Sequence, residues 1–329
     1  MSVDSGRLFE IAWKVLPRLP RPVVRGVFAA AADAAWLVRP AGVCRLEANY
    51  ARVRPGQSRR ALRRLSRAGM RSYMRYYAEA FTLRGMTPEQ IEARVRLVDA
   101  EPVLAARDAG RSVVGALGHL GNWDLAGAYA GLHIMPVTTV AERLEPPHLF
   151  EEFLAFRQDL GMEILALGDD GVFQSLLRAV RATPPRLVPL LADRDLAASG
   201  IEVDMFGRRA RVAAGPAALS VATGAPLVPI SLSYERLAGD RRRRAGSPWG
   251  LVIRFHPEVT TDPALPRKER TAAATQGWVD ALTSAIAEKP EDWHMLQHVF
   301  VEDLDPERYA RTLERASRRT EPEPEGSAS

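Results

Sequence analysis

The sequence predicts an α/β protein with a mostly buried central mixed sheet of about seven strands, flanked by helices and preceded by a helical N-terminal portion. Residues 1–100 show no alternating strand pattern, whereas from about residue 101 short apolar runs alternate with helical stretches. The apolar runs are nearly continuous, which is typical of strands that helices cover on both faces.

The N-terminal portion begins with two apolar runs. Leu8–Leu16 is interrupted by two charged residues and is followed by no small-residue cleavage site, so it does not match a secretory signal peptide. Pro22–Val38 is the most hydrophobic stretch, but it contains Arg25 and Asp33 and is short for a hydrocarbon core of about 30 Å. Flanked by arginines, it is expected either to lie in a membrane interface or to pack as a buried helix on the domain.

Two further helices are expected before residue 100. Gln57–Leu83 is amphipathic and rich in arginine, and Thr87-Pro88-Glu89-Gln90 has the spacing of a capping box with proline at the first helical position. Residues 1–100 are therefore expected to form a membrane-facing helical portion, integrated into one domain with an α/β core over residues 101–310. The proline- and glutamate-rich residues 320–329 are expected to be disordered.

The alternation after residue 101 assigns the individual elements. Strands are expected at residues 112–118, 134–140, 162–167, 187–192, 201–206, 227–234 and 251–256. Helices are expected at residues 123–130, 147–160, 172–182 and 216–223, with a closing helix at 271–288. The arginine run Arg241–Arg244 falls in a predicted loop, either drawn to anionic phospholipid or solvated without a partner.

Composition limits the classes of function. With 329 residues, 47% of them hydrophobic, the chain can bury a large core. The single cysteine, Cys44, excludes a disulfide framework and a multi-thiolate metal site, and is expected to be a small buried hydrophobe. The formal net charge of +5 fits an anionic lipid or a phosphorylated substrate. No nucleic-acid partner is expected, because aromatic residues are not interleaved with the basic ones.

One segment, Gly118-His119-Leu120-Gly121-Asn122-Trp123-Asp124, stands out once the usual hydrolase, NTPase, dinucleotide and zinc motifs are found missing. His119 ends a predicted strand, a glycine turn follows, and Asp124 lies in the first turn of the next helix, at the sheet edge where α/β proteins build ligand sites. A neutral imidazole there can take a proton from a hydroxyl. His298 and Asp303 repeat the spacing without this setting, so a catalytic and a structural histidine both stay open.

The segment resembles the His-x4-Asp/Glu motif of the lysophospholipid acyltransferase superfamily, whose glycerolipid acyltransferase-like fold agrees with the predicted architecture. Asn-Trp inside the motif is similar to the lipid A late acyltransferase branch. Other segments, in order and spacing, resemble the phosphatidylinositol mannoside acyltransferases of actinobacteria; these are Val140–Leu144, Leu191–Leu196, Gly200–Gly207, Gly215–Ala217 and Asp292–Gln297. The resemblance covers roughly residues 5–305.

The resemblance implies transfer of a fatty acyl group, usually palmitoyl, from acyl-CoA to the 6-hydroxyl of a mannose of phosphatidylinositol mannosides. Acyl-CoA is then a co-substrate, no cofactor or metal is implied, and the protein is expected at the cytoplasmic face of the cell membrane, attached peripherally to an anionic surface. His119 matches the general base, Asp193 the acid that partners it, where relatives carry glutamate, and Asp124 the acid that orders the turn and the acceptor.

The resemblance also implies binding residues. Arg157 and Ser199, with His119, match acyl-CoA-binding positions, a further donor position is Ala222 where relatives carry glutamate, and Glu142, Arg143 and His294 match the acceptor pocket. The residues alone allow other interpretations. Glu142 and Arg143 can pair with one another, Arg157 can be an exposed helix residue, His294 can be a core histidine, and Asp193 or Asp195 can pair with Arg194.

Two hypotheses concern groups around the chemistry. Backbone N–H groups of Gly121 and Asn122 are expected to stabilise an oxyanion, and Arg208, Arg209 and Arg211 to meet the phosphates of coenzyme A. Rival functions are a lipid A-type or lysophospholipid acyltransferase and a non-catalytic acyl-CoA- or lipid-binding protein.

Overall fold

The structure is a computed structural model that describes residues 15–143, 147–168, 171–195 and 199–318. The expected disorder of residues 320–329 and most of the apolar run at residues 8–16 lie outside the described residues. In the described part of the N-terminal portion, four helices follow a short 3-10 turn, η1 (Leu16–Arg18). They are α2 (Arg21–Val38), α3 (Ala41–Val53), α4 (Arg59–Leu83) and α5 (Pro88–Arg94). The helix predicted from residue 57 and the capping box at Thr87 are both confirmed.

The central sheet has seven strands in the order β1-β9-β8-β2-β5-β3-β4. Neighbours run parallel except β8 and β9, which are antiparallel, so the sheet is mixed as predicted. The strands are β1 (Val95–Val98), β2 (Val113–Leu117), β3 (Val137–Ala141), β4 (Met162–Ala166), β5 (Leu187–Leu191), β8 (Leu227–Arg236) and β9 (Trp249–Phe255). β2 is buried along its whole length, because strands and helices cover it on every side.

The strands of the central sheet differ from the prediction in two places. The predicted strand at residues 201–206 is β6 (Ile201–Met205), which pairs antiparallel with β7 (Arg208–Val212) in a separate two-stranded sheet. Phe206 and Gly207, both at positive φ, form the tight two-residue turn of that hairpin. The seventh strand of the central sheet is instead β1, which follows α5 directly inside the part predicted to be helical. Its four residues, one buried, one exposed and two intermediate, give little periodic signal.

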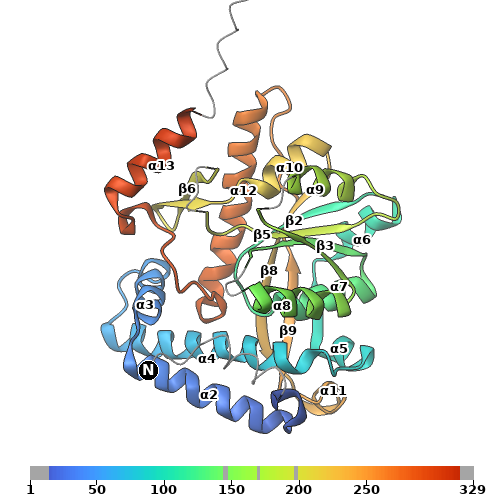
Figure 1. Ribbon diagram of the computed structural model, residues 1–329, viewed down its shortest axis with the longest axis vertical. Helices are drawn as coiled ribbons and strands as arrows, with labels where there is room; N and C mark the ends of the chain where they lie inside the picture. Colours follow the sequence, from blue (N-terminus) through green and yellow to red (C-terminus); the bar gives the residue numbers. More distant parts are fainter. Residues whose placement is uncertain (1–14, 144–146, 169–170, 196–198, 319–329) are drawn as a thin grey trace, which may run out of the picture.

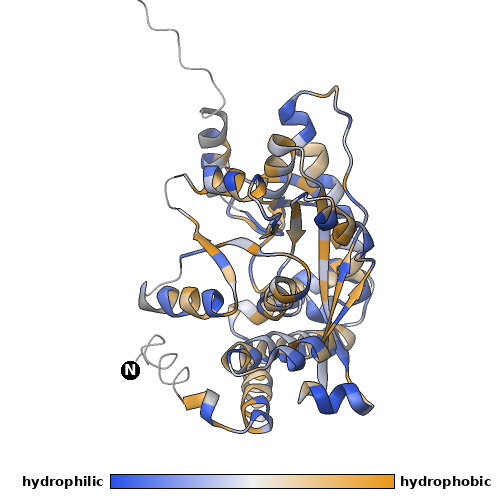
Figure 2. Cartoon of the chain, turned by 90° about the vertical axis from the view of Figure 1, so that its right-hand side faces the viewer, coloured by the Kyte–Doolittle hydropathy of each residue, from blue (hydrophilic) through white to orange (hydrophobic). Residues whose placement is uncertain are grey.

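The remaining helices cover the two faces of the sheet (Figure 1). On one face lie α7 (Trp123–His133) and α8 (Pro147–Asp159), with α4 crossing beside them; the other face carries α10 (Gly215–Thr223) and α12 (Arg267–Glu288). Still others are α6 (Glu101–Asp108), α9 (Val172–Val180), α11 (Gly239–Ala245) and α13 (Pro306–Arg318), with the 3-10 turns η2 (Pro290–Asp292) and η3 (Val301–Asp303). Coloured by hydropathy, several strands of the sheet are orange along much of their length (Figure 2).

Two local predictions are wrong. Arg241–Arg244 lies in the helix α11 rather than in a loop, and Gly246 in the left-handed region follows its last residue. Cys44 is exposed rather than buried. In α3 the buried positions are spaced three and four residues apart and include Val43 and Leu46, which leaves Cys44 on the outer side of the helix.

Helix α2 is only partly covered by the domain. Val24 and Ala32 are buried, whereas large apolar side chains on the outer side are exposed, with Val27 at 53% and Val38 at 80%. Among the described helices no single one is long and apolar enough to cross a membrane, and one pair, α2 with α3, passes that test together with a bend of 83°.

Candidate active site

A cavity of about 850 Å³ lies between one face of the sheet and the helices α4, α7 and α8. Its walls are mainly apolar and aromatic, with contributions from β2, β3, β5, β8 and β9. The charged or titratable side chains other than tyrosine that reach it are His119, Asp124, Glu142, Arg157, Arg194 and His294. A large apolar space with a few converging polar groups is the usual form of a ligand site.

The catalytic-type pair is His119 and Asp193. Leu117 and Leu191 are paired residues at the ends of the parallel neighbours β2 and β5, so the chain positions two residues beyond each strand meet at one edge. There Nδ1 of His119 lies 2.6 Å from Oδ1 of Asp193. The backbone N–H of His119 donates to Oδ2 of the same carboxylate at 2.9 Å. The predicted partnership is therefore present, made by an aspartate.

The carboxylate decides which nitrogen of His119 carries the proton. An ionised Asp193 only accepts, so Nδ1 of His119 donates to it and Nε2 keeps a free lone pair. Burial disfavours a charged ring, but Asp193 outweighs it, and the pKa of His119 is raised above its ordinary value. Burial acts against the carboxylate too, yet His119 keeps the pKa of Asp193 below its ordinary value. The ring is 38% exposed and lines the cavity, so Nε2 can serve as a base there.

Gly118 lets the two groups approach. A Cβ atom at this position would lie 3.0 Å from Oδ2 of Asp193 and 3.2 Å from Cγ, closer than such contacts ordinarily allow. Because both atoms belong to a fully buried side chain held by His119, the carboxylate has little room to move aside. The glycine before the histidine is thus a requirement of the pair.

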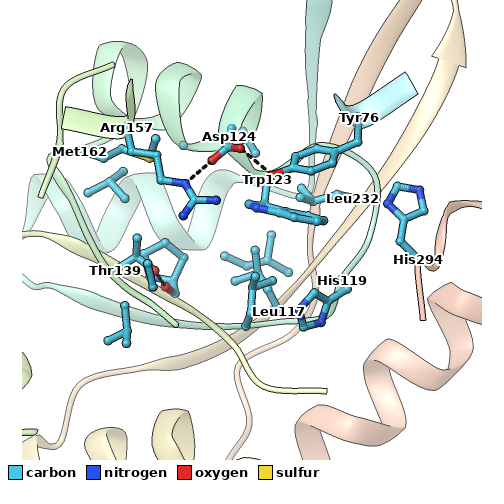
Figure 3. A pocket seen from close by; sticks show the side chains of 18 of the residues that line it. Tyr76, Leu117, His119, Trp123, Asp124, Thr139, Arg157, Met162, Leu232 and His294 are labelled. Carbon is cyan, nitrogen blue, oxygen red and sulfur yellow. Dashed lines mark hydrogen bonds and ion pairs between the residues drawn. The ribbon is translucent and has the colours of Figure 1, made fainter. Parts of the chain in front are cut away.

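Asp124 contacts other groups than His119. Its Oδ1 accepts from Nε of Arg157 at 2.7 Å and its Oδ2 from the hydroxyl of Tyr76 at 2.8 Å (Figure 3). Asn122 caps α7 by accepting the N–H of Leu125 at 2.9 Å, which places Asp124 in the first turn of the helix. Arg157 is therefore a cavity residue with a buried partner, and its interpretation as an exposed helix residue is wrong.

His294 is both a buried histidine and a cavity residue. Its Nε2 lies 3.0 Å from the hydroxyl of Ser72, and its backbone N–H donates to the carbonyl of His119 at 2.8 Å. The ring stands edge-on to Tyr73, with centroids 5.6 Å apart. Burial, with the nearby charges of Arg75 and His119, lowers the pKa of His294 to about 3, so the ring stays neutral.

The other expected binding residues lie further out. Glu142, just after β3, is exposed and lines the cavity. Arg143 is also exposed, with its guanidinium 5.6 Å from the ring centre of Phe150, and it is not among the residues that line the cavity. Ser199 lies outside the cavity as well, and its hydroxyl donates to Asp195 at 3.0 Å. Arg194 donates to the carbonyl of His298, so it does not replace His119 as the partner of Asp193.

Parts of two sequence hypotheses do not fit the contacts. The backbone N–H of Gly121 donates to the carbonyl of Asp292 at 2.9 Å and is not available to an oxyanion. Arg211 is buried and donates to the carbonyl of Gly200, so it cannot meet a solvent-borne phosphate. Arg208 and Arg209 stay exposed and pair with Glu302 and Glu202. β7 is exposed only over these first two residues and buried from Ala210 on, which the sequence did not reveal.

Three contact residues escaped sequence reasoning: Tyr76, which binds Asp124, Ser72, which binds His294, and Trp293, whose indole N–H donates to Asp193 at 2.8 Å. Tyr76 and Ser72 lie on α4, and only the tertiary fold brings that helix to the cavity. Trp293 stood inside one of the resembling segments and offered a signal. Within the described ranges, no three histidine, cysteine or acidic side chains converge as metal ligands.

This fold and site define an acyltransferase of the α/β type, and the chain belongs to the family of bacterial lipid A biosynthesis acyltransferases, whose model matches residues 7–301. It is 38% identical over 305 residues to the phosphatidylinositol mannoside acyltransferase of Mycolicibacterium smegmatis, covering 92% of this chain and 93% of that protein. Proteins of that name from two strains of Mycobacterium tuberculosis are 34% identical over 311 residues, covering 93% of this chain and 92% of theirs.

The His119–Asp193 contact predicts a pH dependence. If the neutral ring of His119 acts as a base, acyl transfer should rise with pH through a pKa above the ordinary histidine value of about 6.5. Asp193→Asn removes the charge that raises this pKa and permits the wrong tautomer. We expect the acid limb of kcat/KM to move to lower pH and turnover to fall on the order of a thousandfold or more.

The matched control is Asp195→Asn, which neutralises the neighbouring carboxylate that Ser199 contacts and should keep the wild-type acid limb. An acid limb unchanged in Asp193→Asn would show that the His119–Asp193 pair does not set the pH dependence.

Proposed function

We propose that this protein transfers a fatty acyl group, palmitoyl in the first instance, from acyl-CoA to the 6-hydroxyl of a mannose of phosphatidylinositol mannosides, with His119 as general base. The single observation that carries the proposal is the Nε2 of His119, which faces an apolar cavity with no hydrogen-bond partner among the described residues, while Nδ1 is held by a buried carboxylate. The names of three relatives at 34–38% identity support the choice of acceptor.

The proposed reaction needs no covalent enzyme intermediate, because a thioester is already activated. Nε2 of His119 takes the proton of the mannose hydroxyl while the hydroxyl oxygen attacks the thioester carbonyl carbon. The Asp193 carboxylate stabilises the imidazolium that forms. Collapse of the tetrahedral adduct breaks the C–S bond, and the leaving thiolate takes the proton from His119, which returns ester, free coenzyme A and neutral base.

The apolar part of the cavity is proposed to hold the acyl chain. His119 and Met162 lie at opposite sides of it, with Leu117 and Thr139 between them and Arg157 and Asp124 above (Figure 3). Arg157 is the proposed acyl-CoA-binding residue that lies inside the cavity. Ser199, exposed beyond the end of β5, is proposed to contact the coenzyme A portion that remains outside.

The acceptor is proposed to enter from the side of Glu142 and His294. A sugar carries many hydroxyls, and the exposed Glu142 carboxylate and the buried neutral His294 ring, which both line the cavity, offer polar contacts that orient one of them toward His119. Arg143, exposed next to Glu142, is proposed to meet the phosphate of the acceptor.

We further propose that the protein sits peripherally at the cytoplasmic face of the cell membrane. Helix α2 presents Val23, Val27 and Leu37 to solvent, and the basic residues Arg21 and Arg39 stand at its two ends. Phe28, on the same helix, lines the cavity. Helix α2 therefore contributes both to the apolar surface proposed to enter the lipid and to the cavity proposed to hold the acyl chain.

The first test is transfer of labelled palmitate from palmitoyl-CoA to purified phosphatidylinositol mono- and dimannoside, beside a lysophospholipid and a lipid A precursor. We expect mannoside acylation alone, reduced on the order of 100- to 10,000-fold in His119→Ala. Acylation of another acceptor instead would keep the base and overturn the acceptor. Acyl-CoA binding without any product would favour a binding protein.

The acyl chain length tests the assignment of the cavity. A Cβ atom at Gly127 would lie 2.3 Å from Sδ of Met162, so this side chain fills the space that a glycine leaves at the inner end. Met162→Ala opens that end, and each methylene newly buried contributes about 0.8 kcal/mol. Competition between palmitoyl- and stearoyl-CoA should shift by about tenfold toward the longer chain. Leu167→Ala, at an exposed position after β4, should leave the ratio unchanged, and the same ratio in both variants would reject this end of the cavity.

Membrane attachment is tested by flotation with vesicles that contain anionic lipid. Replacing both Val23 and Val27 by aspartate puts charges on the apolar side of α2 and should reduce the bound fraction about tenfold or more. Leu132→Asp, at a 51% exposed position on α7, is the matched control and should float like the wild type. Equal flotation of all three proteins would place the contact elsewhere.

A further inference from the structure

Trp293 touches the catalytic pair from behind. Its side chain is completely buried, and its indole Nε1–H donates to Oδ2 of Asp193 at 2.8 Å. Oδ1 of the same carboxylate faces Nδ1 of His119 at 2.6 Å. The two oxygens are thus held from opposite directions, one by the base and the other by the indole.

The backbone around Trp293 is joined to the turn that carries His119. Leu120 and Trp293 form an antiparallel bridge, flanked by the bonds from the N–H of His294 to the carbonyl of His119 and from the N–H of Gly121 to the carbonyl of Asp292. The Trp293 carbonyl also accepts the hydroxyl of Tyr50 at 3.0 Å. Indole, carboxylate and imidazole therefore form one hydrogen-bonded unit.

We propose that Trp293 is a positioning residue for the base: its N–H fixes the Asp193 carboxylate so that Oδ1 stays in line with Nδ1 of His119. The inference rests on the proposed role of His119. A buried carboxylate that lost this donor would keep only the two bonds to His119 described above and could rotate about its Cβ–Cγ bond. The indole also helps to hold the pKa of Asp193 below its ordinary value, after the larger effects of burial and of His119.

Trp278 on α12 is the control that distinguishes positioning of Asp193 from a packing role alone. It is 1% exposed, as buried as Trp293, yet within the described residues its Nε1 has no hydrogen-bond partner. Tryptophan to phenylalanine removes the same atoms at both positions and breaks a bond to a carboxylate at one. The contact of Trp293 with the ring of Phe206, whose centroid lies 6.1 Å away, can persist in the phenylalanine variant.

The experiment compares Trp293→Phe with Trp278→Phe in the full chain, by the pH profile of kcat/KM, by kcat and acceptor KM, and by Tm. We expect Trp293→Phe to lower kcat by about 10- to 100-fold, the effect of one hydrogen bond to a charged group, with little change of KM. Loss of the donor changes both the charge and the orientation that the carboxylate offers the imidazolium, so the acid limb should move by roughly half a pH unit or more. Trp278→Phe should keep both the limb and kcat.

If the two variants lose turnover equally, with unmoved acid limbs, Trp293 serves packing alone and the inference is wrong. Should Trp293→Phe fail to fold, a second experiment tests the inference: the indole N–H signals are compared by NMR in the wild type and in Asp193→Asn, both labelled with ¹⁵N-tryptophan. The inference requires the indole N–H signal of Trp293 to shift in Asp193→Asn while that of Trp278 stays, and an unshifted Trp293 signal overturns it. Failure of the proposed function is distinct, because it shows as full turnover of His119→Ala.

Discussion

The structure of the site depends on one constraint: a carboxylate buried at the end of β5 must have its lone pairs satisfied. Asp193 meets it with the ring and backbone of His119, just beyond β2, and with the indole of Trp293. The pairing of β2 with β5 brings the first two groups together, and the segment after α12 supplies the third. Gly118 follows from the same constraint, since any side chain there would press on the carboxylate.

A second buried charge ties the N-terminal helices to this site. Glu79 on α4 pairs with Arg94 and accepts from Nδ2 of Asn122 at 2.7 Å and from the hydroxyl of Tyr234 at 3.1 Å. Asn122 is the cap of α7, so the helix that carries Asp124 starts on a residue held by α4. Removing one partner of such a cluster leaves an uncompensated buried charge, typically at a cost of about 3–5 kcal/mol. The N-terminal helices are thus part of the framework of the cavity.

The sequence predicted what depends on local pattern and missed what depends on tertiary contact. Mixed sheet, flanking helices and the edge position of His119 follow from periodicity, while the partnership with Asp193 needed the family resemblance as well. β1 was missed because four residues carry too little pattern, and β6 was misplaced because apolar alternation does not say which sheet a strand joins. Cys44 and the N–H of Gly121 were misjudged because exposure and pairing depend on neighbours far along the chain.

The spacing of the catalytic unit has a consequence for when the protein becomes active during its synthesis. His119 and Asp193 are 74 residues apart, and Asp193 and Trp293 a further 100. Contacts of such long range form only after the entropy of closing large loops has been overcome. A chain emerging from the ribosome therefore carries a histidine with no oriented proton until nearly all of the domain has been made. Under the proposed mechanism, partly folded molecules would not consume an activated thioester, and turnover would report complete folding.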